Sequence, residues 1–219
     1  MCIRDRHLDA HRAGPMSVQV LVLAKQPRAG RVKTRLCPPF TPQGAAEVAA
    51  AALEDTLDVV RSVPVARRVL VLDGTYPAPG FVLQPQRGGP MPERLAAAFD
   101  DCDPDLPALL IGMDTPQLST RLLAQAVAAL EAHPAVLGPA PDGGWWALGL
   151  RRPDGALLAD VPTSRADTGR KQLARLQSAG LDPHLLPQLR DVDTADDARA
   201  VAALVPDGRF AAVVGAVLT

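Results

Sequence analysis

Cysteine, aromatic residues and an excess of either charge are scarce in this sequence, and each scarcity excludes a class of protein. The three cysteines share no CxxC or cysteine–histidine spacing, so neither a disulfide framework nor a structural zinc site is indicated. Aromatic residues make up 3% of a chain that is 47% hydrophobic, which favours a helix-rich α/β protein over an all-β sandwich. The net charge of −1 argues against a nucleic-acid or anionic-membrane binder, because both need a broad basic face.

The two ends of the chain indicate neither a secretory signal nor a membrane span. Residues 1–15 carry scattered charges and no apolar core, so they do not form a secretory signal, and the apolar run at 210–219 is about half the ~20 residues that a membrane span needs. We expect a protein of the reducing cytoplasm. We also expect one domain over 17–219, behind a leader over 1–16 that is disordered or an artefact of gene calling, with Met16 as the true start.

Strand patterns recur along the chain. The runs VQVLVLA (18–24), RRVLVLD (67–73) and PALLIGMD (107–114) are apolar almost throughout, as in strands that are covered on both faces. A shorter run at 81–86 contains proline and suits a sheet edge. Further strands are expected at 135–142, 145–150 and 184–189.

Helix patterns separate most of these strands. A helix after Thr41 begins with a hydroxyl cap and a proline, Ser119 caps another, and Thr194 opens a third through a capping box. Two more helices are expected at 93–102 and about 165–179. Alternating strands and helices predict a mostly parallel, doubly wound sheet, whose ligands lie beyond the carboxyl ends of its strands.

The segment AKQPRAGRVKTRL (24–36) follows the first strand and concentrates positive charge in a nearly neutral chain. It holds two of the three lysines and no acidic residue. Main-chain N–H groups near Gly30 and the flanking cations predict a phosphate-binding loop, formed by Lys25, Arg28, Arg31, Lys33 and Arg35. No Walker loop or GxGxxG motif is present. The alternative is a solvated arginine-rich loop.

Carboxylates stand at two places where strands meet loops. Asp114 ends a buried strand, and we interpret it as a ligand of Mg²⁺ or Mn²⁺, which prefer oxygen ligands and bridge to phosphates. Asp191 and Asp193 alternate along an extended segment, so we expect only Asp193 to face the site as a second ligand, with Asp191 as support. The alternatives are a turn cap at Asp114 and acids that favour a helix N-terminus at 191–193.

The segment PAPDGGWWALGL (139–150) joins an acid, two glycines and both tryptophans. Asp142 is our candidate catalytic base, and Gly143 and Gly144 would allow a substrate to approach the backbone. The alternative is a hairpin turn with the tryptophans in the core. A serine hydrolase is not indicated, because the chain lacks GxSxG and its histidines cluster with no nucleophile.

Five segments in this order give the chain a resemblance to a family of small bacterial proteins with a glycosyltransferase-A (GT-A) fold. They are KQPRAGRVKTRL, PQRGGPMPERLAAAF, GMDTP, LGPAPDGGWWALGL and DVDTADD. The family is related more distantly to 2-phospholactate guanylyltransferases and molybdenum-cofactor nucleotidyltransferases. The resemblance implies a Rossmann-like nucleotide-diphospho-sugar transferase fold, phosphates near Lys25, Lys33 and Arg35, and a metal at Asp114.

The second segment of the resemblance adds Glu93 and Arg94 as candidate substrate-binding residues. Relatives tend to have Asp-Leu-Gly-Glu-Arg where this chain has Pro-Met-Pro-Glu-Arg, and they favour tyrosines where this chain has Trp145 and Trp146. Both differences bear on the nucleotide and acceptor contacts.

Three hypotheses of function follow. The first is a Mg²⁺- or Mn²⁺-dependent glycosyltransferase that uses a nucleotide-sugar donor and an unknown acceptor. The second is a nucleotidyltransferase that releases pyrophosphate from a triphosphate. The third is a non-catalytic nucleotide-binding protein. The sequence does not choose the donor base, the sugar, the stereochemical outcome or the oligomeric state, and it indicates neither a nucleic-acid partner nor a membrane span.

Overall fold

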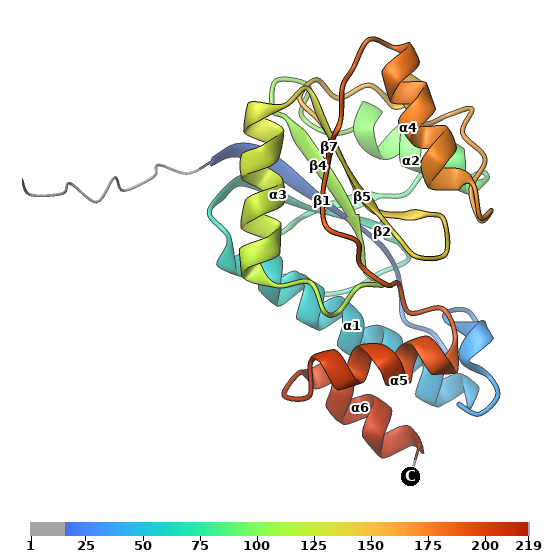
Figure 1. Cartoon of the computed structure of the whole chain (residues 1–219). Helices are drawn as coiled ribbons and strands as arrows, with labels where there is room; N and C mark the ends of the chain where they lie inside the picture. Colours follow the sequence, from blue (N-terminus) through green and yellow to red (C-terminus); the bar gives the residue numbers. More distant parts are fainter. Residues whose placement is uncertain (1–15, 219) are drawn as a thin grey trace, which may run out of the picture.

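Seven strands form one sheet in the order β3-β2-β1-β4-β6-β5-β7 (Figure 1). The structure is a computed structural model that describes residues 16–218. All neighbouring strands run parallel except where β6 pairs with β4 and β5. The strands are β1 (Met16–Lys25), β2 (Val65–Asp73), β3 (Val82–Pro85), β4 (Ala108–Gly112), β5 (Ala135–Pro139), β6 (Trp145–Leu150) and β7 (His184–Leu185).

Helices cover both faces of the sheet and confirm the predicted α/β class. They are α1 (Pro42–Ser62), α2 (Met91–Asp100), α3 (Thr120–Ala132), α4 (Thr168–Ser178), α5 (Ala195–Leu204) and α6 (Arg209–Leu218), with short 3-10 helices η1 (Thr34–Leu36) and η2 (Gly155–Leu157). The predicted caps are confirmed: the hydroxyls of Thr41, Ser119 and Thr194 accept backbone N–H groups of the first turns, and Thr194 and Asp197 form the capping box.

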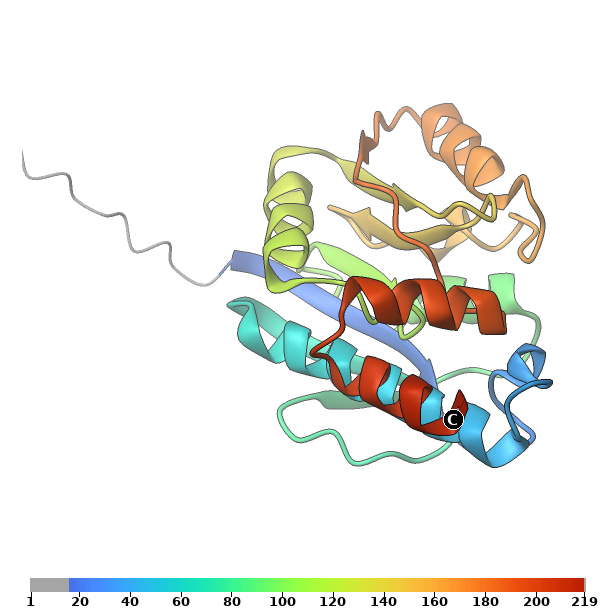
Figure 2. The same cartoon turned by 60° about the horizontal axis from the view of Figure 1, so that its bottom comes forward.

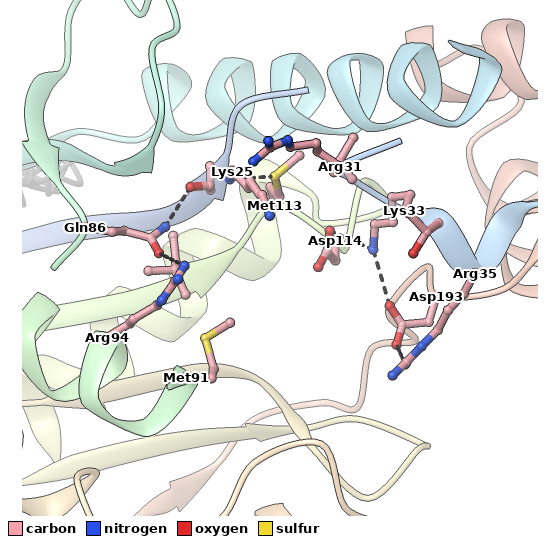
Figure 3. Close-up of a pocket in the computed structure, with 14 residues that line it drawn as sticks. Lys25, Arg31, Lys33, Arg35, Gln86, Met91, Arg94, Met113, Asp114 and Asp193 are labelled. Atoms are coloured by element: carbon pink, nitrogen blue, oxygen red, sulfur yellow. Dashed lines mark hydrogen bonds and ion pairs between the residues drawn. The ribbon is translucent and has the colours of Figure 1, made fainter. Parts of the chain in front are cut away.

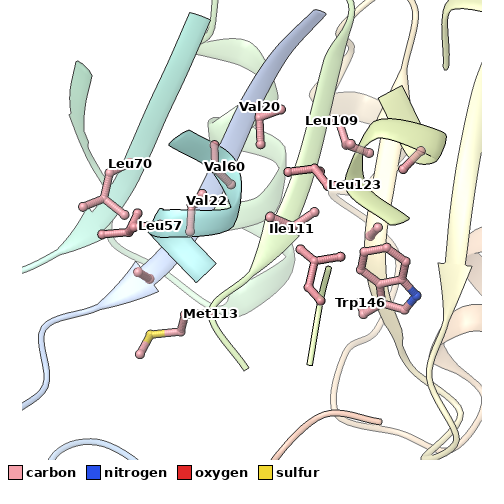
Figure 4. Close-up of a cluster of buried hydrophobic side chains, with 14 of the residues drawn as sticks. Val20, Val22, Leu57, Val60, Leu70, Leu109, Ile111, Met113, Leu123 and Trp146 are labelled. Atoms are coloured by element: carbon pink, nitrogen blue, oxygen red, sulfur yellow. The ribbon is translucent and has the colours of Figure 1, made fainter. Parts of the chain in front are cut away.

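The central strands bury side chains on both faces. On β1, Val20 and Val22 pack with α1 and α3 (Figure 4). Leu21, between them in the sequence, packs on the opposite face with α2. Each of the three is fully buried. Helices on both sides therefore require apolar residues at successive positions of this strand, from Val20 to Ala24, which is why the sequence shows a continuous run there and no alternation.

A third cluster of buried side chains lies beyond the sheet, where α5 and α6 pack beside α1 (Figure 2). Phe210 of α6 is fully buried there. The same cluster holds Leu36 of η1 and Phe40, so the C-terminal helices support the segment that follows β1. The apolar run at 210–219, which we considered only as a possible membrane span, is mostly the helix α6.

Several predicted element bounds differ from the structure. The run at 184–189 forms only the two-residue strand β7, and α4 begins at Thr168, three residues after the predicted start. Residues 1–15 of the expected leader lie outside the described residues. Its last residue, Met16, is the first residue of β1. Over residues 16–218, no helix is both long and apolar enough to cross a membrane.

Candidate functional site

Two adjoining cavities lie beyond the carboxyl ends of β1 and β4. The smaller has a volume of about 330 Å³ and is lined mainly by the segment after β1 and by α2. The larger, of about 490 Å³, is lined by the β5–β6 turn and by residues 163–168. Asp114 and Asp193 line both cavities, so these two carboxylates stand at the boundary between them.

Lys33 lies between these two carboxylates (Figure 3). Its Nζ is 2.8 Å from Oδ1 of Asp114 and 3.4 Å from Oδ1 of Asp193, and it also donates to the carbonyl oxygen of Val192. The side chain is only 7% exposed. Burial disfavours the ammonium charge, but the two carboxylates outweigh that effect and raise the pKa of Lys33 above its ordinary value.

The backbone holds Lys33 in this position. Its φ of 48° and ψ of 38° are left-handed, a conformation uncommon for a residue with a side chain. The turn continues into η1, whose Leu36 is fully buried against the C-terminal helices. Backbone strain of this kind costs about 1–3 kcal/mol and persists where surrounding packing imposes it.

The other predicted cations divide into two groups. Arg35 pairs with Asp193, with 3.0 Å between its Nη1 and Oδ2, and remains 70% exposed. Lys25, Arg28 and Arg31 line a small side cavity of about 100 Å³, and Lys25 and Arg31 also line the smaller main cavity. Within residues 16–218, Arg28 and Arg31 form no ion pair, so their charges are free to meet a ligand.

Arg94 enters the smaller cavity from α2. Its guanidinium is 3.2 Å from a carboxylate oxygen of Asp73, and its Nε donates to the carbonyl of Gly89. Gln86 lies beside it, with its amide nitrogen bound to backbone carbonyls of β1 and β2 (Figure 3). Glu93, in contrast, is exposed on α2 and lines neither main cavity.

The β5–β6 turn forms one wall of the larger cavity. Asp142 is exposed and accepts a hydrogen bond of 2.7 Å from the backbone N–H of Gly144. Gly143 has a φ of +88°, and a Cβ built on it would lie 2.0 Å from the carbonyl oxygen of Ala166. Its own carbonyl accepts a 2.7 Å bond from the N–H of Gly169. The turn is therefore tied to Ala166 and Gly169, and Gly143 has a structural role and lines neither main cavity.

The expectation that only Asp193 faces the site is wrong, because Asp191 lines the larger cavity as well. Residues 190–193 form no strand, so the alternation of side chains that holds in strands does not apply to them. Burial first, and then the negative charge of Asp142, raise the pKa of Asp191 to about 6. Two acids, Asp142 and Asp191, thus face one space.

Some residues of the site were missed. Asp73 ends β2 as Asp114 follows β4, and the rule that ligands meet strand ends could have identified it. Residues 163–168 gave no signal, although Ser164 has a positive φ of 58° and lines the larger cavity. The hydroxyl of Thr115, beside Asp114, is buried without a hydrogen-bond partner.

The carboxylates fit a divalent cation that is completed by a substrate. Over residues 16–218, no cluster of three or more His, Cys, Asp or Glu side chains could hold a metal ion. Asp114 and Asp193 nevertheless bring two oxygens within 3.4 Å of one point, which is the position of the Lys33 ammonium. Mg²⁺ commonly binds through one or two carboxylates and substrate phosphates, and that pattern matches this pair beside the basic cavity.

Comparisons with known proteins agree with this fold. The model of the family "Uncharacterized protein conserved in bacteria (DUF2064)" matches residues 56–165, half of the chain. No curated protein matches the sequence. A solved structure of a proposed nucleotide-diphospho-sugar transferase from Desulfovibrio desulfuricans G20 is 23% identical, with a TM-score of 0.76 over 90% of this chain and 96% of that one.

Two further solved structures share the fold at lower similarity. Rv0371c of Mycobacterium tuberculosis H37Rv, in complex with manganese, is 23% identical with a TM-score of 0.54 over 85% of this chain and 97% of its own. The 2-C-methyl-D-erythritol 4-phosphate cytidylyltransferase of Thermus thermophilus is 19% identical with a TM-score of 0.55 over 87% and 100%. The predicted GT-A type of fold is confirmed.

Proposed function

The chain belongs to the bacterial family DUF2064, and from its two adjoining cavities we propose that it is a transferase that uses a nucleotide substrate and a divalent cation. The observation that carries the proposal is the position of Asp114 and Asp193 between a basic cavity and an acidic one. A phosphate group in the basic cavity and an acceptor in the other would meet at these carboxylates. Reaction between two bound molecules needs this juxtaposition.

Glycosyl transfer from a nucleotide-sugar is our first assignment. The acceptor oxygen would bond to the anomeric carbon while the bond from that carbon to the diphosphate oxygen breaks. The diphosphate keeps the electron pair, and the proton of the acceptor passes to Asp142, whose second carboxylate oxygen is not used by Gly144. The fold shared with the proposed nucleotide-diphospho-sugar transferase supports this choice.

The basic side chains would stabilise the departing diphosphate. Lys25, Arg31 and Arg35 line the smaller cavity, and their charges would meet the negative charge that grows on the leaving oxygen. Mg²⁺ or Mn²⁺ held by Asp114 and Asp193 would supply further neutralisation there. The manganese complex of Rv0371c shows that a protein of this fold binds such an ion, and supports the assignment here.

Nucleotidyl transfer is the second candidate. It is favoured by the fold shared with a cytidylyltransferase, and with a synthetase whose structure holds CTP. In this reaction an acceptor oxygen would bond to the α-phosphorus as pyrophosphate leaves with the bonding electrons. The same cations would then bind a triphosphate.

Product analysis distinguishes these candidates. The protein would be incubated with nucleotide-sugars and with nucleoside triphosphates, with Mn²⁺ or with EDTA, and the products resolved by anion-exchange chromatography. We expect release of a nucleoside diphosphate from a nucleotide-sugar, which is the product of glycosyl transfer. Release of pyrophosphate from a triphosphate would instead support nucleotidyl transfer. Asp114→Asn should remove either activity. Binding without turnover of any substrate would favour a non-catalytic nucleotide-binding protein and reject both reactions.

A further inference from the structure

Every donor of the Lys33 ammonium is engaged by groups that we assign to the divalent cation or that lie beside it. An ammonium has three N–H donors, and Lys33 directs them to Asp114, Asp193 and the carbonyl of Val192. Val192 is itself tied to Asp114 by a backbone hydrogen bond of 2.9 Å. Lys33 therefore has no donor left for a phosphate group in this arrangement, although it lines the smaller cavity.

A divalent cation and this ammonium cannot share the two carboxylates unchanged. The ion would take oxygens that Lys33 holds at 2.8 Å and 3.4 Å, and its two charges would repel the ammonium at a similar distance. Burial makes the conflict stronger, because a nearly enclosed ammonium depends on these carboxylates for its charge. One of the two cations has to move.

We propose that Lys33 is an internal cation that neutralises Asp114 and Asp193 before ligand binds, and that metal loading releases it towards the phosphates. This inference rests on the metal site of the proposed function. Asp114 and Asp193 thus remain paired in both states, first with the lysine and then with the ion. The ammonium moves into the cavity that also holds Lys25 and Arg31, so it becomes a phosphate ligand only once the metal is present.

The surroundings of Lys33 allow this movement. Its four-carbon stem is flexible, and the smaller cavity adjoins the carboxylates on the side of the basic residues. Arg35 contacts the other oxygen of Asp193, Oδ2, at 3.0 Å, so Asp193 keeps a cationic neighbour when Lys33 leaves. The left-handed backbone of Lys33 fixes the base of the side chain, which confines the movement to the side-chain torsions.

The test is a titration of the protein with Mn²⁺ in the absence of nucleotide, in which the electron paramagnetic resonance signal of the free ion reports binding. Lys33→Met removes the competing charge and keeps an unbranched side chain, so it should bind Mn²⁺ about tenfold more tightly than the wild type, an expectation from charge repulsion at this distance. Adding Asp114→Asn to Lys33→Met should abolish the gain. Lys171→Met is the matched control, because Lys171 pairs with Asp167 outside both main cavities and should leave Mn²⁺ affinity unchanged.

The same substitution of Lys33 should have the opposite effect on nucleotide affinity measured in the presence of Mn²⁺. Lys33→Met should bind a nucleoside diphosphate more weakly than the wild type, because the released ammonium is missing from the phosphates. Tighter metal binding together with weaker nucleotide binding is the signature of an exchanged cation. A purely structural role for Lys33 would weaken both, and would overturn the proposal.

Two further results would also reject it. In the first, Lys33→Met binds Mn²⁺ with the affinity of the wild type and still requires Mn²⁺ to bind nucleotide. This result would refute the exchange and leave the proposed function standing. Nucleotide binding by the wild type that is unaffected by EDTA refutes the metal itself, and with it the exchange. If Lys33→Met does not fold, Lys33→Gln, which keeps a donor for Val192, should show the same two signs.

Discussion

Gly143 should tolerate no side chain, because two separate constraints act on it. Its φ of +88° is unfavourable for an L-residue, and a Cβ would lie 2.0 Å, 2.5 Å and 2.8 Å from three backbone atoms of Ala166. Gly180, two residues after the end of α4, has a similar φ of +76° but no atom within 4 Å of a built Cβ. The pair Gly143→Ala and Gly180→Ala therefore separates backbone strain from collision.

The difference between the two variants can be worked out from the structure. Strain at positive φ costs about 1–2 kcal/mol in either variant. The loss of glycine from the unfolded chain offsets about 0.4–1 kcal/mol of that in both. Only Gly143→Ala must also displace the carbonyl of Ala166, from 2.0 Å to an ordinary contact of 3.4 Å, and so disturb the 2.7 Å bond from Gly169 to Gly143. We expect this variant to lose about 2 kcal/mol more than the control, since a broken hydrogen bond and local repacking each contribute about 1 kcal/mol.

Urea unfolding followed by circular dichroism measures both variants on one scale. Gly180→Ala should unfold at a urea concentration close to that of the wild type, and Gly143→Ala at a clearly lower one with the same slope. Equal destabilisation of the two variants would show that residues 163–168 yield freely to the new methyl group. The inference that this segment pins the β5–β6 turn, and with it Asp142, would then be wrong.

Three other predictions test different parts of the molecule. Arg94→Ala should weaken nucleotide binding about tenfold or more, since a hydrogen bond to a charged group contributes about 1.5–3 kcal/mol. Arg87 lies outside both main cavities, so Arg87→Ala should leave the affinity unchanged, and isothermal titration calorimetry measures both variants. Phe210→Ala should lower the free energy of unfolding in urea by about 3–5 kcal/mol, as for other buried aromatic residues. Leu204→Ala, at a side chain that is 67% exposed, should change it little, and similar losses in both variants would contradict the role of Phe210 in the third cluster. The raised pKa of Asp191, about 6, means that its protonation favours the folded state, so this contribution is present at about pH 4 and lost as the pH rises to about 7. Asp191→Asn should therefore gain stability relative to the wild type across that range in EDTA, and a constant difference would contradict the shift.

The fold could be predicted from the sequence because its signals are local. Buried strands such as 18–24 and 107–114 are apolar on both faces, and the caps at Thr41 and Ser119 need only their own first turn. The turn at 140–144 joins strands that pair with each other, which the Asp-Gly hairpin interpretation anticipated. That hairpin accounts for the single antiparallel strand in an otherwise parallel sheet.

The candidate site was only partly predictable because it depends on tertiary contacts. Nothing in the segment after β1 distinguishes Lys33, which is buried between two acids, from Arg31, which is exposed. The placement of Asp191 failed because the alternation rule assumes a regular strand. Asp114 could be placed at the edge of the sheet, where it lines both main cavities, because the sheet itself defines the position of a lone acid after a buried strand. Its role as a metal ligand stays a prediction.

The triad of Asp114, Lys33 and Asp193 joins parts of the chain that are synthesised far apart in time. Lys33 and Asp193 are 160 positions apart, and Asp193 belongs to the segment that crosses back just before α5. While the ribosome still holds that segment, a folded sheet can present Lys33 to Asp114 alone, without the second carboxylate. All seven strands precede Asp193 in the chain, and α5 and α6 follow it. The proposed nucleotide and metal site would therefore arise late in biosynthesis, and a chain that ends before Asp193 would lack the second carboxylate.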